Sequence, residues 1–142
     1  MGLSLSAAAA IIGISLVISL ELLIGSIIPA VDNYSFSFNE MKNRAIEQVQ
    51  TDINISNIAT SANISNHDLN ITVENTGSTV LETCDFNILI DGANTDFYCK
   101  TSYLYPDNDT YFEVYNQAGV GSKRIKIVTN NGICEYDQYT IT

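Results

Sequence analysis

The chain has 142 residues and a formal net charge of −10, because sixteen carboxylates outnumber six basic side chains. All six basic residues and fifteen of the carboxylates lie after residue 31. This negative field repels nucleic acid and anionic lipid headgroups, which argues against a nucleic-acid function and favours proteins, cations or neutral surfaces as partners.

Residues 1–31 are predicted to form an uncleaved N-terminal membrane anchor. The run from Leu3 to Leu20 is eighteen residues without a charge, and Glu21 is then followed by ten uncharged residues. At about 1.5 Å per residue, eighteen residues already cover most of a hydrocarbon core roughly 30 Å thick. A secretory signal peptide would have a basic n-region and a shorter apolar stretch, and neither is present.

Three polar residues of this anchor are candidates for helix packing. Ser15 and Ser19 lie four residues apart, a spacing that lets two helices approach closely, although small residues are also common in such helices without a packing role. Glu21 either pairs with a partner helix or reaches the headgroup region.

Two opposing signals in the sequence bear on which side of the membrane the domain lies. Lys42 and Arg44 follow the span and would keep that side in the cytoplasm. Five Asn-x-Ser/Thr sequons favour the opposite side, where they are candidate glycosylation sites. These sequons begin at Asn33, Asn54, Asn63, Asn70 and Asn108. We expect the domain to lie outside the cytoplasmic membrane.

Residues 32–53 are predicted to be a connector followed by an amphipathic stalk helix. Pro29 ends the apolar run, and Asn39 is suited to cap a new helix. Apolar residues then recur at three- and four-residue spacing; they are Phe38, Met41, Ala45, Val49 and Ile53. This stripe is expected to pack on the following domain or on a second copy of the chain.

Residues 54–142 are predicted to form an immunoglobulin-like antiparallel sandwich. Leu69, Ile71 and Val73 alternate with polar residues, and about six further short runs follow at the spacing typical of such a fold. Asp91-Gly92 is a strong hairpin signal, and Asn75–Ser78 and Asn130–Gly132 are predicted turns.

The three cysteines are Cys84, Cys99 and Cys134. Cys84 and Cys99 flank the Asp91–Asn94 turn almost symmetrically and are expected to face each other across a hairpin. One disulfide plus one buried thiol and three reduced cysteines are both open at this stage. The spacings match no zinc pattern.

The sequence predicts no enzyme, cofactor or metal site. His67, the only histidine, precedes Asp68, but no nucleophile elbow accompanies the pair, so we expect a solvated turn histidine. Asp107-Asn108-Asp109 begins like a calcium loop yet lacks its later glycine and glutamate, which favours a turn after Pro106 over weak calcium binding. The many late tyrosines suit either a protein interface or ordinary strands.

Two segments carry a resemblance to a known family. Met-Gly-Leu-Ser-Leu-Ser-Ala precedes the apolar helix, and Leu-Asn-Ile-Thr-Val-Glu-Asn-Thr-Gly-Ser-Thr-Val-Leu spans Leu69 to Leu81. Together with the layout of helix, stalk and acidic sandwich, they resemble the archaellum accessory family FlaF, with the sister family FlaG and the archaellins sharing the turn. No defined site of the family maps onto individual residues of this chain.

The resemblance implies a membrane-anchored, non-enzymatic archaellum motor component. In the family the domain lies outside the cytoplasmic membrane, dimerises, and is held to act as a stator that contacts the S-layer, beside FlaG-like motor proteins. The alternatives are a surface adhesin or an archaellin, a type IV pilin-like filament subunit. Archaellin precursors carry a basic residue ahead of their glycine, and none precedes Gly2. This difference favours the stator over the archaellin as the sequence-based expectation.

Overall fold

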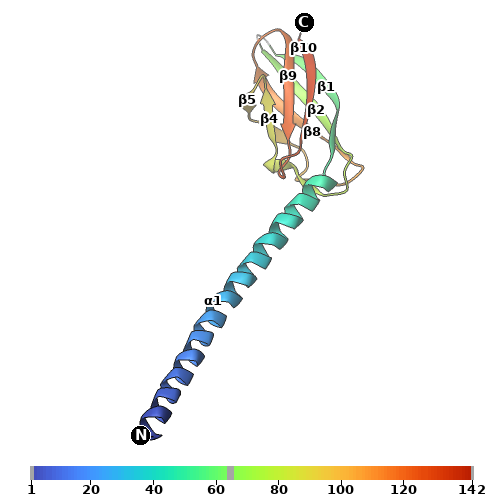
Figure 1. Ribbon diagram of the computed structural model, residues 1–142. Helices are drawn as coiled ribbons and strands as arrows, with labels where there is room; N and C mark the ends of the chain where they lie inside the picture. Colours follow the sequence, from blue (N-terminus) through green and yellow to red (C-terminus); the bar gives the residue numbers. More distant parts are fainter. Residues whose placement is uncertain (1, 64–65, 142) are drawn as a thin grey trace. The chain divides into compact units, whose positions relative to one another are not determined.

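A long helix and a β-sheet domain make up the computed structural model, which describes residues 2–63 and 66–141 (Figure 1). The helix, α1, runs from Gly2 to Gln50. Within the described residues it is the single helix long and apolar enough to cross a membrane. The last seven residues of α1 belong with the strands, because residues 44–142 form one compact unit, here called the β-domain.

The helix is continuous, whereas the sequence predicted an apolar helix ending near Pro29 and a separate stalk helix from Asn39. Pro29 lies inside α1. A proline in a helix interior removes one hydrogen bond and costs roughly 3 kcal/mol, but that cost is local. The apolar residues on either side of Pro29 continue the helix, and membrane helices tolerate proline more often than soluble ones.

The predicted stalk stripe spans both compact units, and only Ala45, Val49 and Ile53 belong to the β-domain. Val49 is 87% exposed, and Phe38 and Met41 are also exposed. Ile53 belongs to the first strand instead and is buried in the core. Val49 therefore does not pack on the strands, and packing of Phe38 and Met41, on the domain or on a second copy, stays a prediction.

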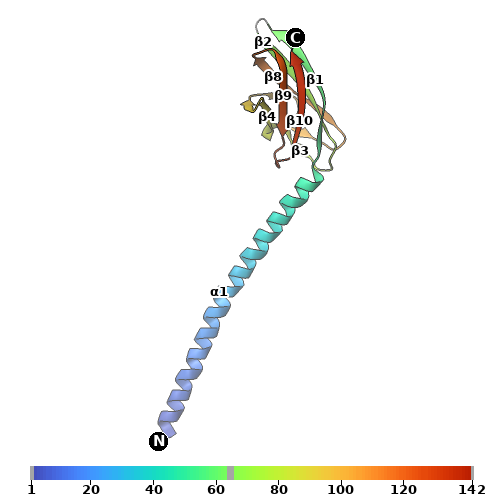
Figure 2. The ribbon, with the colours of Figure 1, turned by 45° about the horizontal axis from the view of Figure 1, so that its top comes forward.

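Within the described residues, ten strands follow the helix, and Figures 1 and 2 show their arrangement. They are β1 (Ile53–Asn63), β2 (Asn66–Asn75), β3 (Leu81–Glu82), β4 (Asn87–Ile90), β5 (Ala93–Thr95), β6 (Tyr98–Cys99), β7 (Tyr103–Leu104), β8 (Asp109–Gln117), β9 (Gly121–Val128) and β10 (Cys134–Ile141). A short 3-10 helix, η1, covers Thr83–Asp85.

The strands form two four-stranded antiparallel sheets and one small ladder. The first sheet has the order β1-β2-β8-β6 and the second the order β10-β9-β4-β5, while β3 pairs with β7. The predicted N-terminal helix followed by an antiparallel β-domain is confirmed. The immunoglobulin-like topology stays a prediction.

Alternating strand residues supply one core between the sheets. Burial alternates along the whole of β2, which places Leu69, Ile71 and Val73 inside. Ile125 and Ile127 of β9 are fully buried on the opposite side. The core also contains an aromatic cluster, in which the ring centroids of Phe86 and Phe97 lie 5.5 and 5.3 Å from that of Phe112.

Local turn chemistry is where the sequence predicts best. Asp91 and Gly92 both have positive φ, at 50° and 85°, and join β4 to β5. Two successive positive φ angles are the requirement of the type I′ hairpin turn, for which Asp-Gly is a preferred pair. The Asp91 side chain also accepts a hydrogen bond from the Arg124 backbone N–H at 2.9 Å.

His67 lies on β2 and is only 3% exposed, so the expectation of a solvated turn histidine is wrong. The alternation of β2 turns its side chain inward, where its ring centroid lies 6.0 Å from that of Tyr139. The pKa of His67 is lowered from its ordinary 6.5, first by burial and then by the charge of Lys123, with Asp68 opposing. Burial likewise raises the pKa of Tyr139 to about 12, so both rings are neutral at pH 7.

We expect the β-domain to lose stability as the pH falls below about 6.5. Below this pH the unfolded chain binds a proton at His67, whereas the folded chain, in which the pKa of His67 is lowered, does not. The contribution of neutral His67 to the free energy of unfolding is therefore complete above the unfolded pKa and decreases as the pH falls below it. One proton limits this contribution to a slope of about 1.4 kcal/mol per pH unit. Urea unfolding of the full chain between pH 8 and 5 measures it; an equal slope in His67→Phe would contradict the assignment.

Candidate functional site

The helix meets the β-domain in a network of backbone hydrogen bonds. Carbonyl groups at the end of a helix have no partner within the helix and need one elsewhere. The Gln50 carbonyl accepts a hydrogen bond from the Ser78 N–H at 2.8 Å. The Asp52 carbonyl accepts from the N–H groups of Thr76 and Gly77 at 3.1 and 3.0 Å. The loop after β2 therefore binds the chain where α1 ends.

Gly77 is the residue that permits this approach. A Cβ atom at this position would lie 2.5 Å from both the Asp52 nitrogen and the Gln50 oxygen. Both are backbone atoms, which cannot move aside as the tip of a flexible side chain can. Any residue with a side chain would therefore push the loop away from the helix end.

Asn75 holds the loop in shape from within. Its side chain is fully buried, and its amide group donates to the carbonyls of Thr79 at 2.7 Å and Leu104 at 3.1 Å. Its Oδ1 atom accepts a hydrogen bond from the Gly77 N–H at 3.0 Å. All polar atoms of this buried amide are thus used in fixing the loop, as buried polar groups require.

A second loop reaches the same helix end. Asn131, in the turn between β9 and β10, donates from its side chain to the Thr51 hydroxyl, and its carbonyl accepts from the Gln48 side chain at 3.0 Å. The buried Thr51 hydroxyl also lies 2.8 Å from the Glu47 carbonyl and 2.6 Å from the Thr79 hydroxyl. We call Thr51, Asn75, Gly77, Ser78 and Asn131 the helix clamp.

The helix clamp is suited to carrying load rather than to catalysis. Its hydrogen bonds join three segments that are far apart in the sequence, so both loops hold the last residues of α1. None of its five members ionises near neutral pH, and among the described residues no cluster of three or more potential metal ligands occurs. The sequence predicted both turns, but gave no sign that they meet at the helix end.

The predicted helix-packing residues lie exposed along α1. The Ser15 hydroxyl donates to the Ile12 carbonyl at 2.8 Å, and the Ser19 hydroxyl donates to the Ser15 carbonyl at 2.7 Å. Each serine thus satisfies its hydroxyl within its own helix and presents a small surface outward. Their role in packing, and that of Glu21, stays a prediction.

The predicted cysteine pair is close in space, although not as neighbours across a hairpin. Cys84 lies in η1 and Cys99 in β6, and their sulfur atoms are 3.0 Å apart. Both are thiols in this structure, and the hydrogen bond to Cys99 is the main cause that raises the pKa of Cys84. Cys134 lies on β10 and is half-buried.

The sequons differ in accessibility. Asn33 on α1, Asn54 on β1 and Asn108 in the turn before β8 are exposed, whereas Asn70 on the inner strand β2 is half-buried. The sequon at Asn63 lies partly outside the described residues. Since a glycan needs room at the surface, Asn54 and Asn108 are the better-placed acceptors of the β-domain, and modification of any of the five stays a prediction.

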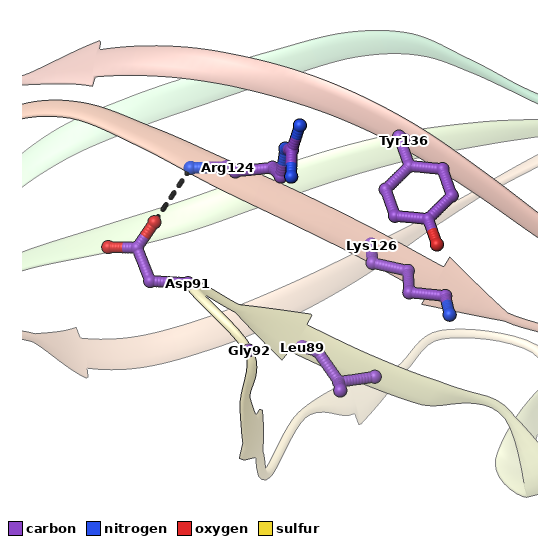
Figure 3. Close-up of a pocket in the computed structure, with 6 residues that line it drawn as sticks. All are labelled: Leu89, Asp91, Gly92, Arg124, Lys126 and Tyr136. Atoms are coloured by element: carbon purple, nitrogen blue, oxygen red, sulfur yellow. Dashed lines mark hydrogen bonds between the residues drawn. The ribbon is translucent and has the colours of Figure 1, made fainter.

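An open hollow lies over the outer face of the second sheet (Figure 3). Its lining includes Leu89, Arg124 and Lys126, with the Lys126 ammonium 5.1 Å from the centre of the Tyr136 ring. Lys123 of the same strand forms an ion pair with Asp91 at 2.9 Å. Half of the basic residues of the chain thus lie on β9, but the hollow offers no nucleophile–base pair.

One comparison with known proteins matches a family model to almost the whole chain. The family model described as archaeal-type flagellin matches residues 4–142, which includes both α1 and the β-domain. No curated protein matches the chain. The match contradicts the expected stator-like accessory function and favours the filament subunit kept as an alternative.

Proposed function

This chain belongs to the archaeal-type flagellin family, and on that premise we propose that it is a filament subunit of an archaellum. The observation that carries the proposal is the extent of the family match, which runs from the apolar helix through the last strand. Flagellins are structural proteins, so the proposal needs no active site.

The surface of α1 supports a role in assembly. Its large apolar residues from Leu5 to Val31 are about half exposed or more on every side of the helix. A helix that is apolar all round is stable in water only when other apolar groups surround it. We propose that lipid surrounds it before assembly and that the helices of other copies surround it within the filament.

The helix clamp supports the same proposal mechanically. A filament that moves a cell transmits torque between its helical core and the domains attached to it. A flexible linker between the two would absorb that torque. Here strand β1 begins at Ile53, three residues after α1 ends at Gln50, and the intervening residues are hydrogen-bonded to two loops. The clamp therefore holds the end of α1 firmly to the loops of the β-domain.

Filaments sheared from cells are expected to contain this chain as a main component, and cells without the gene are expected to lose filaments and swimming. Mass spectrometry of the sheared material gives the stoichiometry, and a shortened N-terminus would further support a filament subunit. Complementation with the intact gene is the control. Normal filaments in the deletion strain, or filaments that lack the chain, would contradict the proposal.

A further inference from the structure

We propose that Cys84 and Cys99 are the site of an oxidative cross-link that ties the two sheets of the β-domain together. The inference concerns the β-domain alone and does not depend on the role of the chain in a filament. Its first support is the 3.0 Å distance between the two sulfur atoms.

The backbone around the two cysteines is already held in register. Leu81 pairs with Leu104 and Glu82 with Tyr103 in the β3–β7 ladder. The Thr83 N–H then donates to the Ser102 carbonyl at 3.1 Å, and the Thr83 hydroxyl donates to the Thr101 carbonyl. This register places Cys84 opposite Thr101, two residues from Cys99, so the sulfur contact lies directly beside the end of an ordered ladder.

The cross-link would connect elements that belong to different sheets. Cys84 lies just before β4, which is in the second sheet, and Cys99 lies in β6, the edge strand of the first sheet. Two residues from each cysteine, Phe86 and Phe97 contact the buried ring of Phe112. Oxidation would thus close the edge of the sandwich directly beside its aromatic cluster.

The reaction needs an electron acceptor, for which we name a low-molecular-weight disulfide. The thiolate of Cys84, the more exposed of the two, attacks one sulfur of that disulfide and releases one small thiolate. The Cys99 thiolate then attacks the Cys84 sulfur and releases the second. Two protein thiols thereby lose two protons and two electrons, and the disulfide becomes two small thiols.

Peptide mapping of the native full chain, alkylated at lysis, tests the cross-link directly. Cleavage before aspartate separates the cysteines, because Asp85, Asp91 and Asp96 lie between them. We expect a peptide beginning at Asp68 to be joined to one beginning at Asp96, with the joined species lost after reduction. Alkylation of both Cys84 and Cys99 in the native protein, or linkage of either to Cys134, would overturn the proposal.

Thermal unfolding of the full chain in detergent supplies the second readout, after oxidised glutathione treatment with and without a reductant. A cross-link closing a loop of this length is expected to raise the Tm by roughly 10 to 20 °C. Cys134→Ser should keep that difference, whereas Cys84→Ser and Cys99→Ser should abolish it. A Tm of the wild-type chain that is insensitive to the reductant would overturn the proposal even if both variants fold.

Discussion

Replacing Gly77 with alanine is expected to lower the free energy of unfolding of the β-domain by about 3 to 5 kcal/mol. The new Cβ atom would lie 2.5 Å from the backbone at Asp52 and Gln50, so the loop must retreat. Its retreat breaks the hydrogen bonds that Thr76, Gly77 and Ser78 donate to the helix end. Urea unfolding of the full chain in detergent measures the loss.

Ser78→Ala is the matched control for this substitution. It alters the same loop, but Ser78 is exposed and its hydroxyl makes only a long 3.5 Å contact with the Gln50 carbonyl. Its backbone N–H bond to Gln50 remains, so the change should stay within about 0.5 kcal/mol of wild type. Hydrogen exchange at the amides of residues 76–78 should accelerate in the alanine variant of Gly77 alone; equal exchange in both variants would contradict the clamp.

A prediction for the assembled state follows from the same geometry. If the filament assignment holds, cells carrying Gly77→Ala should lose swimming before they lose the protein, because a loosened clamp weakens torque transfer. Ser78→Ala cells should swim normally. Filaments on cells that no longer swim, at wild-type levels of folded protein, are the expected observation by electron microscopy and swimming assay, and normal motility of the Gly77→Ala strain would contradict a mechanical role.

The sequence predicts those parts of the fold that depend on neighbouring residues. Asp91-Gly92 specifies its own hairpin through the φ angles it permits, and the alternation in Leu69, Ile71 and Val73 specifies one face of β2. Each signal is complete within a few residues, so the structure agrees with it. The apolar run after Leu3 predicts α1 for the same reason, because twenty such residues have few other stable arrangements.

Predictions fail where distant residues decide the outcome. Ile53 fits the four-residue spacing of the helix before it. In the structure α1 ends at Gln50, and Ile53 lies in β1 with its side chain buried in the core. The apolar alternation between Val80 and Ile90 is interrupted by η1, where the Thr83 N–H donates to the Ser102 carbonyl. His67 is predicted to be solvated from its neighbours in the sequence, but the pairing of β2 in the sheet places its side chain in the interior. The sequence does not predict the helix clamp, because Thr51 and Asn131 lie eighty residues apart in the chain.

Replacing Asn75 with alanine is expected to cost about 3 kcal/mol, the second large effect. The substitution leaves the Thr79 and Leu104 carbonyls and the Gly77 N–H without the partner that Asn75 provides. Because the site is fully buried, water cannot readily replace these bonds, and each unpaired group keeps its desolvation cost. Tm and urea unfolding of the full chain give the magnitude.

Asn75→Asp separates hydrogen bonding from side-chain shape at this position. Aspartate has nearly the same volume and still accepts from the Gly77 N–H, but when ionised it cannot donate to the two carbonyls. It should therefore destabilise as strongly as alanine at pH 7 and partly recover at acidic pH, where a protonated carboxyl donates one bond again. Asn130→Ala, an exposed asparagine in the β9–β10 turn, is the control and should remain near wild type. If Asn75→Asp matched wild type at pH 7, the two donated bonds would not be what holds the loop in shape.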